Sequence, residues 1–210
     1  MRRSERARAV AELLAAAYPE ARCELDYRDP WELLVATVLS AQCTDERVNQ
    51  VTPVLFGRWP TPAAMAQAPL DELEAVIRPT GFFRNKARAL RGAAEALVAR
   101  HGGTVPAELE ALVELPGVGR KTAKVVLGEA FGIAAGIAVD THVRRVAGRL
   151  GLTRADDPEA IAGELERLVP RPGWVAFSMR MILHGRRVCV ARRPRCAGCP
   201  LDPACVKAGV

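Results

Sequence analysis

The chain has 210 residues with a formal net charge of +6; half of its residues are hydrophobic and only 5% are aromatic. This length accommodates one large domain or two small ones around a buried core, and the positive charge favours a polyanionic partner without establishing one. Because no apolar stretch approaches transmembrane length and Met1-Arg2-Arg3 leads into an amphipathic segment, we expect a cytosolic protein with no membrane partner.

Helical periodicity dominates the first part of the chain, which is rich in alanine and poor in β-branched runs. Asp29-Pro30-Trp31-Glu32 predicts a helix start, with an N-cap acid and a proline at the first helical position. A polar loop, Ser40-Ala41-Gln42-Cys43-Thr44-Asp45, then lies between two apolar helical segments. The sequence therefore predicts an all-α protein.

A second interruption, Gly81-Phe82-Phe83-Arg84-Asn85-Lys86, places two aromatic side chains beside basic and amide groups. Both phenylalanines could belong to the core, an interpretation favoured for Phe83. One of the two could instead be an exposed wedge beside a stacked base.

The centre of the chain, Leu115-Pro116-Gly117-Val118-Gly119-Arg120-Lys121-Thr122-Ala123, separates two stretches of helical apolar spacing. Pro116 ends the first stretch, and Gly117 and Gly119 permit a tight reversal before the second. The pattern predicts a helix–hairpin–helix whose amides lie at a positive helix end suited to phosphate.

Lys121 falls in the first turn of the second hairpin helix, roughly opposite its apolar stripe. Most such lysines are simply solvated. Here the positive helix end, Arg120 and Lys124 all disfavour an ammonium, so we expect this amine to lose its proton more readily than most. An amine of that kind beside a phosphate-binding loop is suited to Schiff-base chemistry.

Ile137-Ala138-Val139-Asp140-Thr141-His142-Val143 leads from an apolar entry into a basic helix. Asp140 is a good N-cap, and a carboxylate fixed at a helix start could also serve chemistry. The arginines that follow, Arg144, Arg145 and Arg149, can be read as a solvated face. A last helix is expected from Trp174 to His184, before Gly185.

Cys189, Cys196, Cys199 and Cys205 form a C-x6-C-x2-C-x5-C pattern. In a reducing compartment this density indicates a metal site rather than disulfides. Zinc sites usually contain two C-x2-C pairs, whereas a [4Fe-4S] cluster accepts uneven spacing, so the spacing alone leaves the metal open. Cys23 and Cys43 stand apart and are expected to be small buried residues.

Together these motifs resemble those of the endonuclease III family, the bacterial iron–sulfur DNA glycosylase/AP lyases of the helix–hairpin–helix superfamily. The resemblance covers essentially the whole chain and depends on the hairpin, Val139-Asp140-Thr141-His142-Val143, Ile182-Leu183-His184-Gly185-Arg186 and the cysteine spacing. It implies an all-α, two-domain fold. A six-helix domain at 23–134 would carry the hairpin, and residues 1–22 would join 135–210 around a [4Fe-4S] cluster on the four cysteines.

The resemblance also implies a reaction and a partner. Lys121 would attack C1′ of a flipped, oxidised pyrimidine nucleotide, and an imine followed by β-elimination would cleave the strand. Asp140 would assist as a carboxylate. The protein would act as a monomer on double-stranded DNA containing damaged pyrimidines or abasic sites, in the bacterial cytoplasm and at the nucleoid. The expected DNA-contacting residues are Gln42, Phe82, Gly117, Val118, Gly119, Arg120, His142, Arg192, Arg193 and Arg195.

Two positions depart from the best-known members of that family. Phe82 stands where those members carry leucine, so opposite-base preference and lesion range are expected to be affected. Cys43 lies inside the loop of Gln42, where the family fills the gap left by the flipped base.

Two rival functions are weighed against this assignment. Related glycosylases that remove adenine from mismatches lack a lysine at the position of Lys121, so its presence argues against them. A non-catalytic DNA-binding or redox protein built on a cluster would not need both Lys121 and Asp140.

Overall fold

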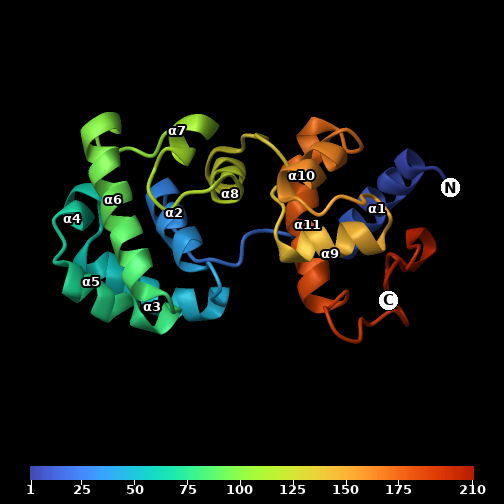
Figure 1. The fold of residues 1–210 in the computed structure, drawn as a ribbon, viewed down its shortest axis with the longest axis horizontal. Coiled ribbons are helices and arrows are strands. Elements are labelled where there is room, and N and C mark those ends of the chain that lie inside the picture. Colours follow the sequence, from blue (N-terminus) through green and yellow to red (C-terminus); the bar gives the residue numbers. More distant parts are fainter. The chain divides into compact units, whose positions relative to one another are not determined.

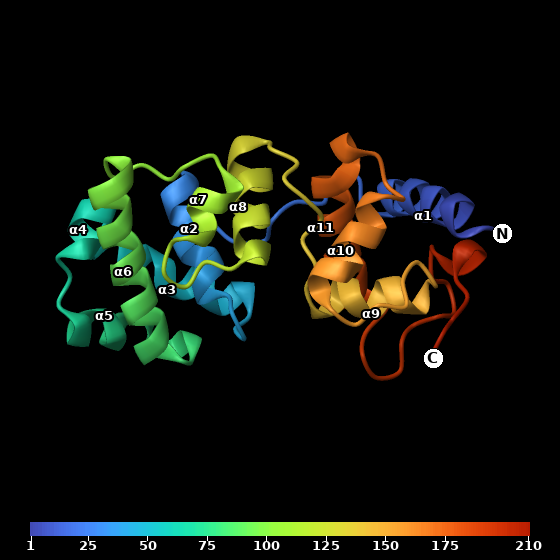
Figure 2. The ribbon, with the colours of Figure 1, turned by 45° about the horizontal axis from the view of Figure 1, so that its top comes forward.

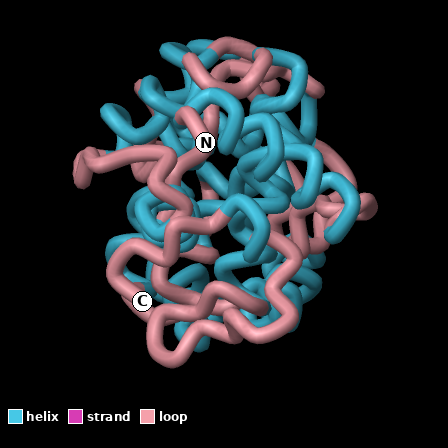
Figure 3. The backbone as a smooth tube through the Cα atoms, turned by 90° about the vertical axis from the view of Figure 1, so that its right-hand side faces the viewer, coloured by secondary structure: helices cyan, strands magenta, loops and turns pink.

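The computed structural model describes residues 1–210 as helices joined by loops and turns, with no β-strand (Figure 3). The chain forms two compact units, Glu24–Ile133 and the combination of Met1–Cys23 with Ala134–Val210. The domain boundaries expected from the sequence, at 23–134, differ from these by one residue at each end. No helix combines the length and apolar character that crossing a membrane requires.

The unit Glu24–Ile133 contains seven α-helices rather than the six implied by the resemblance. Two of them, α4 and α7, have only five residues each. The helix α4 is a separate element because Thr61 caps it, accepting a hydrogen bond from the amide of Ala64 at 3.2 Å. The elements are α2 (Pro30–Leu39), α3 (Asp45–Arg58), α4 (Pro62–Ala66), α5 (Leu70–Ile77), the short 3-10 helix η1 (Arg78–Thr80), α6 (Phe83–His101), α7 (Leu109–Val113) and α8 (Arg120–Phe131).

Helix α2 is the core of this unit (Figure 1). Every residue from Trp31 to Leu39 is buried, which explains why its sequence is apolar apart from Glu32 and Thr37. It packs against α3, α6 and α8, so the hairpin that precedes α8 is attached directly to the core.

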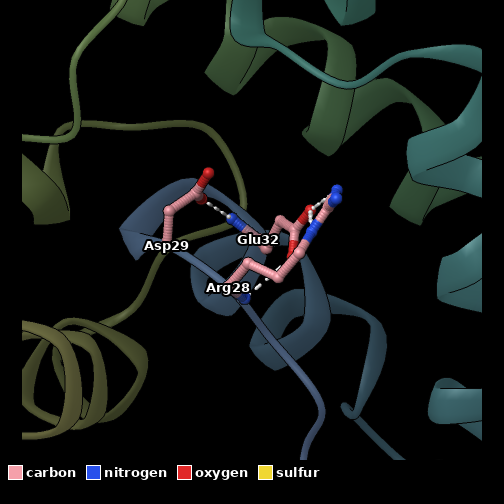
Figure 4. Close-up of polar contacts among 3 residues, drawn as sticks. All are labelled: Arg28, Asp29 and Glu32. Atoms are coloured by element: carbon pink, nitrogen blue, oxygen red, sulfur yellow. Dashed lines mark hydrogen bonds and ion pairs between the residues drawn. The ribbon is translucent and has the colours of Figure 1, made fainter.

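The start of α2 is secured by polar groups of three residues (Figure 4). Asp29 caps the helix by accepting a hydrogen bond from the amide of Glu32 at 2.8 Å. The buried Glu32 carboxylate reaches back and accepts from the Arg28 amide at 2.8 Å and from its guanidinium. Such reciprocal bonds satisfy donors that a helix start leaves unpaired.

The other unit contains α1, α9, α10 and α11, with two short 3-10 helices. Helix α11 packs against both α9 and α1 (Figure 2), which joins the first residues of the chain to its last third. The bounds are α1 (Arg3–Ala17), α9 (Thr141–Arg149), α10 (Pro158–Glu166), η2 (Arg171–Gly173), α11 (Trp174–Arg187) and η3 (Asp202–Ala204).

Gly185 does not end the last helix, as the sequence suggested, because α11 continues to Arg187. Its role is close packing. A Cβ at Gly185 would lie 2.8 Å from the Cβ of His142 on α9, closer than two carbon atoms can approach. The glycine is therefore a contact point between the two helices.

We expect Gly185→Ala to destabilise the protein by about 1–3 kcal/mol, because the new methyl overpacks this contact. Gly148→Ala is the matched control, since a Cβ at Gly148 in α9 meets nothing within 4 Å. It should stabilise the protein by about 0.5–1 kcal/mol through helix propensity. Urea and thermal unfolding measure both changes, and equal midpoints for the two variants would contradict the packing role.

Candidate functional site

The predicted hairpin is present between α7 and α8. The amide of Val118 donates to the carbonyl of Leu115 at 3.1 Å, and both of these side chains are buried. Gly117 has a φ of +77°, and a Cβ there would lie 2.6 Å from the Cβ of Ala89, so only glycine fits. Gly119 has an ordinary extended backbone and open space around it, so the turn itself does not require glycine at that position.

The start of α8 has no side-chain cap. Its N-cap residue is Gly119, which offers no acceptor to the amides of the first turn. Gly117 and Gly119 are exposed, whereas Val118 supplies the buried side of the turn. Arg120 is exposed and pairs with Glu110 at 3.3 Å. A helix start of this kind is suited to an anion supplied from outside the chain.

Lys121 is the second residue of α8 and is exposed. The chain has four lysines, and the other three are placed differently. Lys86 and Lys124 are buried, and Lys207 pairs with Asp202 at 2.6 Å. Lys121 is thus the one lysine whose amine is exposed and makes no ion pair or hydrogen bond within the chain.

Asp140 is the N-cap of α9, in the other unit. Its Oδ1 accepts from the amides of His142 and Val143, both at 2.8 Å. Both bonds use the same oxygen, so Oδ2 makes no hydrogen bond within the chain. The N-cap interpretation is confirmed, and it leaves one carboxylate oxygen in a fixed direction for another partner.

Two of the three arginines expected on a solvated face of α9 instead contact the cysteine segment. Arg144 is exposed and pairs with Asp156 at 2.9 Å, as that interpretation implies. Arg145 donates from Nε to the carbonyl of Cys189 at 3.0 Å and from Nη2 to that of Gly185 at 2.9 Å. Its Nη2 also lies 3.2 Å from Nδ1 of His142, which is half-buried.

Arg149 makes the second set of contacts to the cysteine segment. Its guanidinium donates to the carbonyls of Val190 at 2.7 Å and Ala191 at 2.9 Å, and Nη1 lies 3.5 Å from the sulfur of Cys189. Its own carbonyl accepts from the amide of Ala208 at 3.1 Å. The end of α9 therefore binds the cysteine segment at two places, just after Cys189 and again at Ala208.

Cys189, Cys196, Cys199 and Cys205 are free thiols that line one cavity of this unit. Burial raises the pKa of Cys199, and the other three cysteines raise it further, against a hydrogen bond from the Leu201 backbone. Four thiols around one cavity suit a bound cation, because its positive charge would offset the cost of ionising a buried thiol beside the others. No group of three His, Cys, Asp or Glu side chains is placed to hold a single metal ion.

His184 lies beneath this cavity and is buried in α11. Its Nδ1 is 3.0 Å from the hydroxyl of Tyr18, and its Nε2 is 3.7 Å from the sulfur of Cys199. Burial lowers the pKa of His184 to about 4, so the ring is neutral at pH 7 and carries one N–H. The sequence gives no local signal for this link, since Tyr18 is 166 residues away.

The basic loop Arg192–Arg195 connects the first two cysteines. Its three arginines, Arg192, Arg193 and Arg195, are exposed. Arg193 has a φ of 53°, and the amide of Arg195 donates to the carbonyl of Val188 at 3.0 Å, which closes the loop. The loop therefore presents its charges to solvent.

The loops of Gln42 and Phe82 both belong to the unit Glu24–Ile133. Gln42 is exposed, and the Phe82 side chain is 62% exposed. Phe83 is half-buried, with the guanidiniums of Arg78 and Arg84 within 5.6 Å and 5.5 Å of its ring centre. Of the two phenylalanines, Phe82 is thus the more exposed, as the wedge hypothesis requires.

Cys23 and Cys43 are half-buried rather than buried as expected. Neither is among the thiols that line the cavity of the other four cysteines.

Comparison with known proteins places these features in a family. Residues 35–171 match the family model described as "HhH-GPD superfamily base excision DNA repair protein". The chain is 52% identical to endonuclease III of Synechocystis sp. over 206 residues, which cover 98% of this chain and 94% of the relative. It is 47% identical to endonuclease III of Bacillus subtilis, covering 90% and 86% of the two chains.

A solved structure shows the same likeness in three dimensions. It is a trapped covalent intermediate of an endonuclease III with DNA, in an estranged-adenine complex. The TM-score is 0.94 at 44% sequence identity, and the match covers 99% of this chain and 97% of that one.

Proposed function

Because the chain belongs to the HhH-GPD superfamily and, within it, to the endonuclease III family of base excision repair glycosylase/lyases, we propose that it removes oxidised pyrimidines from double-stranded DNA. We further propose that it cleaves the strand through a Schiff base on Lys121. The observation that carries this proposal is the position of Lys121. It is the chain's exposed, unpaired lysine, and it follows an uncapped helix start suited to a phosphate.

Lys121 acts as the nucleophile. Its unprotonated amine attacks C1′ of the flipped nucleotide, the C1′–N bond breaks, and the base leaves with the electron pair. The nitrogen then loses a proton and forms an imine with C1′ as the C1′–O4′ bond breaks, so that the sugar ring opens and O4′ becomes a hydroxyl. Loss of a proton from C2′ then breaks the C3′–O bond and expels the 3′ phosphate. A covalent enzyme–DNA species is the kind described for the structurally similar endonuclease III.

Asp140 assists this reaction through Oδ2. The two amide bonds to Oδ1 hold the carboxylate in one direction. A fixed negative charge stabilises the positive charge that develops on the sugar as the base leaves. The N-cap and the catalytic role therefore use different oxygens of one side chain.

DNA contacts are assigned to four places on the chain. The exposed glycines of the hairpin and Arg120 address phosphates, and the arginines of the loop Arg192–Arg195 add positive charge. Gln42 fills the space left by the flipped base, and Phe82 enters the stack as a wedge. His142 is half-buried, and its side chain packs against Gly185, so its contribution comes through the amide that it gives to Asp140.

The cysteines Cys189, Cys196, Cys199 and Cys205 are assigned to a [4Fe-4S] cluster. When bound, the cluster supplies ligation energy that orders the C-terminal segment. The loop between Cys189 and Cys196 is then tied at both ends, which stiffens its arginines for phosphate contact.

The purified protein should be yellow-brown and contain iron and acid-labile sulfide in equal amounts. Cys199→Ser should lose both and make the C-terminal segment sensitive to protease, because ligation orders it. Cys23→Ser should retain both, since Cys23 lies outside the thiol cavity. A colourless preparation with stoichiometric zinc and full activity would contradict the assignment.

Lys121→Gln should abolish both covalent trapping by borohydride on damaged duplex DNA and strand cleavage, because the imine-forming amine is gone. Lys121→Arg is the charge-matched control. It keeps the cation beside the hairpin and should bind DNA nearly normally, yet it cannot form an imine. Neither variant should change the thermal midpoint, since Lys121 is exposed and its amine makes no hydrogen bond or ion pair within the chain. Trapping by either variant would assign the nucleophile to another amine.

Asp140→Asn should slow base removal by about two to three orders of magnitude, since the fixed negative charge is lost. Folding should be retained because asparagine caps a helix about as well as aspartate. Asp157→Asn makes the same change at the N-cap of α10, where Asp157 accepts from the amide of Ala160 at 2.9 Å. Single-turnover excision compares the two, and a near-normal rate for Asp140→Asn would reduce Asp140 to a cap.

A further inference from the structure

Lys86 is a buried cation to which the proposed chemistry assigns no role. It lies in the first turn of α6 and is only 6% exposed. Its Nζ donates to the carbonyl of Leu39 at 2.8 Å and to that of Thr80 at 2.7 Å. An ammonium buried in this way requires acceptors, and both of these acceptors are backbone carbonyls.

The two acceptors stand directly before the two loops assigned to DNA. Leu39 ends α2, and the loop of Gln42 begins at the next residue. Thr80 ends η1, and Gly81 and Phe82 follow it. Lys86 therefore bonds to the last residue of regular structure ahead of each loop.

Each of these loops contains a strained residue. Gln42 has a φ of 54° and Phe82 a φ of 47°, in the left-handed region that non-glycine residues rarely adopt. Such conformations persist only where the surrounding structure holds them, and they concentrate at functional sites.

Lys86 also holds Phe82 from its other side. The backbone amide of Lys86 donates to the carbonyl of Phe82 at 3.1 Å. The side chain of Lys86 thus fixes the chain just before Phe82, and its amide fixes the chain just after. At the end of α2 the same ammonium donates to the Leu39 carbonyl, which the helix leaves unpaired at the negative end of its dipole.

We propose that Lys86 is the positioning residue that holds the Gln42 loop and the Phe82 loop in register with each other, so that wedge insertion and gap filling occur together during base flipping. The proposal rests on the proposed function, because it assigns both loops to DNA. Lys86 itself touches no DNA in this role. It acts through the two carbonyls and therefore affects the step in which the nucleotide leaves the stack.

Lys86→Met tests this role, because methionine keeps the length of the side chain and removes its donors. On a duplex with an oxidised pyrimidine such as thymine glycol, single-turnover base excision should slow by about 10- to 100-fold, as expected when a positioning contact is lost. On the same duplex with a preformed abasic site, borohydride trapping should change by less than about threefold, because no base must be flipped.

Two further variants separate positioning from mere stability. Leu97→Ala truncates a buried side chain farther along α6, and it should lower the thermal midpoint without favouring one substrate over the other. Phe82→Ala should show the same substrate difference as Lys86→Met. If Lys86 acts through the Phe82 loop, the double variant should be no slower than about the slower single variant.

Equal losses on both substrates for Lys86→Met, or fully additive effects in the double variant, would overturn the proposal. If Lys86→Met does not fold, Lys86→Gln, which keeps a donor for one carbonyl, is measured in the same pair of assays and must show the same substrate difference. Wild-type protein is the reference throughout. Its failure to excise the lesion and to be trapped would refute the proposed function, whereas normal wild-type activity with undiscriminating Lys86 variants would refute only this inference.

Discussion

The peptide groups at the ends of helices must find hydrogen-bond partners, and a chain made of short helices has many such ends. In this protein two of these partners are residues to which function is assigned. Asp140 satisfies the first amides of α9, and Lys86 satisfies the last carbonyl of α2. The start of α8 is the contrasting case, since Gly119 has no side chain to accept from the amides of the first turn. A helix end that the chain does not cap suits a phosphate from DNA. The need to pair the peptide groups at helix ends therefore accounts both for the side chains held at such ends and for the uncapped start of α8.

The C-terminal segment has few apolar side chains to bury, and this limits its stability. After α11 it contains only one short 3-10 helix, and few of its side chains, among them Leu201 and Ala204, are buried. Its order within the chain comes from polar contacts, chiefly from the guanidinium and carbonyl of Arg149. Such a segment has little stability of its own, so the ligation proposed at its cysteines would have a structural purpose.

Structural features that depend on residues close together in the chain could be predicted from the sequence. The cap residues Asp29 and Asp140 were both expected, because a cap and its amide lie two or three residues apart. The glycine at position 117 was expected for the same local reason, although its collision with Ala89 adds a tertiary one. The all-helical character also followed, since alanine content and helical periodicity agree along the chain.

Features decided by distant neighbours could not be predicted in this way. Lys86 reaches a carbonyl 47 residues away, and Arg149 reaches a sulfur 40 residues away, so no window of sequence contains both partners. Gly185 was taken as a helix end because glycine commonly ends helices, whereas its reason is the approach of His142 from α9. The spacing of Arg145 and Arg149, one helical turn apart, was a usable signal that both point toward the same neighbour.

The connection of α1 to α11 has a consequence for synthesis on the ribosome. The unit Glu24–Ile133 is continuous and can fold as soon as it has emerged. The other unit is made of the first 23 residues and the last 77, so the apolar face of α1, including Val10 and Leu14, has no partner until α11 is made. Tyr18, translated early, likewise has to await His184. Packing of this unit around the four cysteines is therefore a late event, completed only when Cys205 has emerged from the exit tunnel.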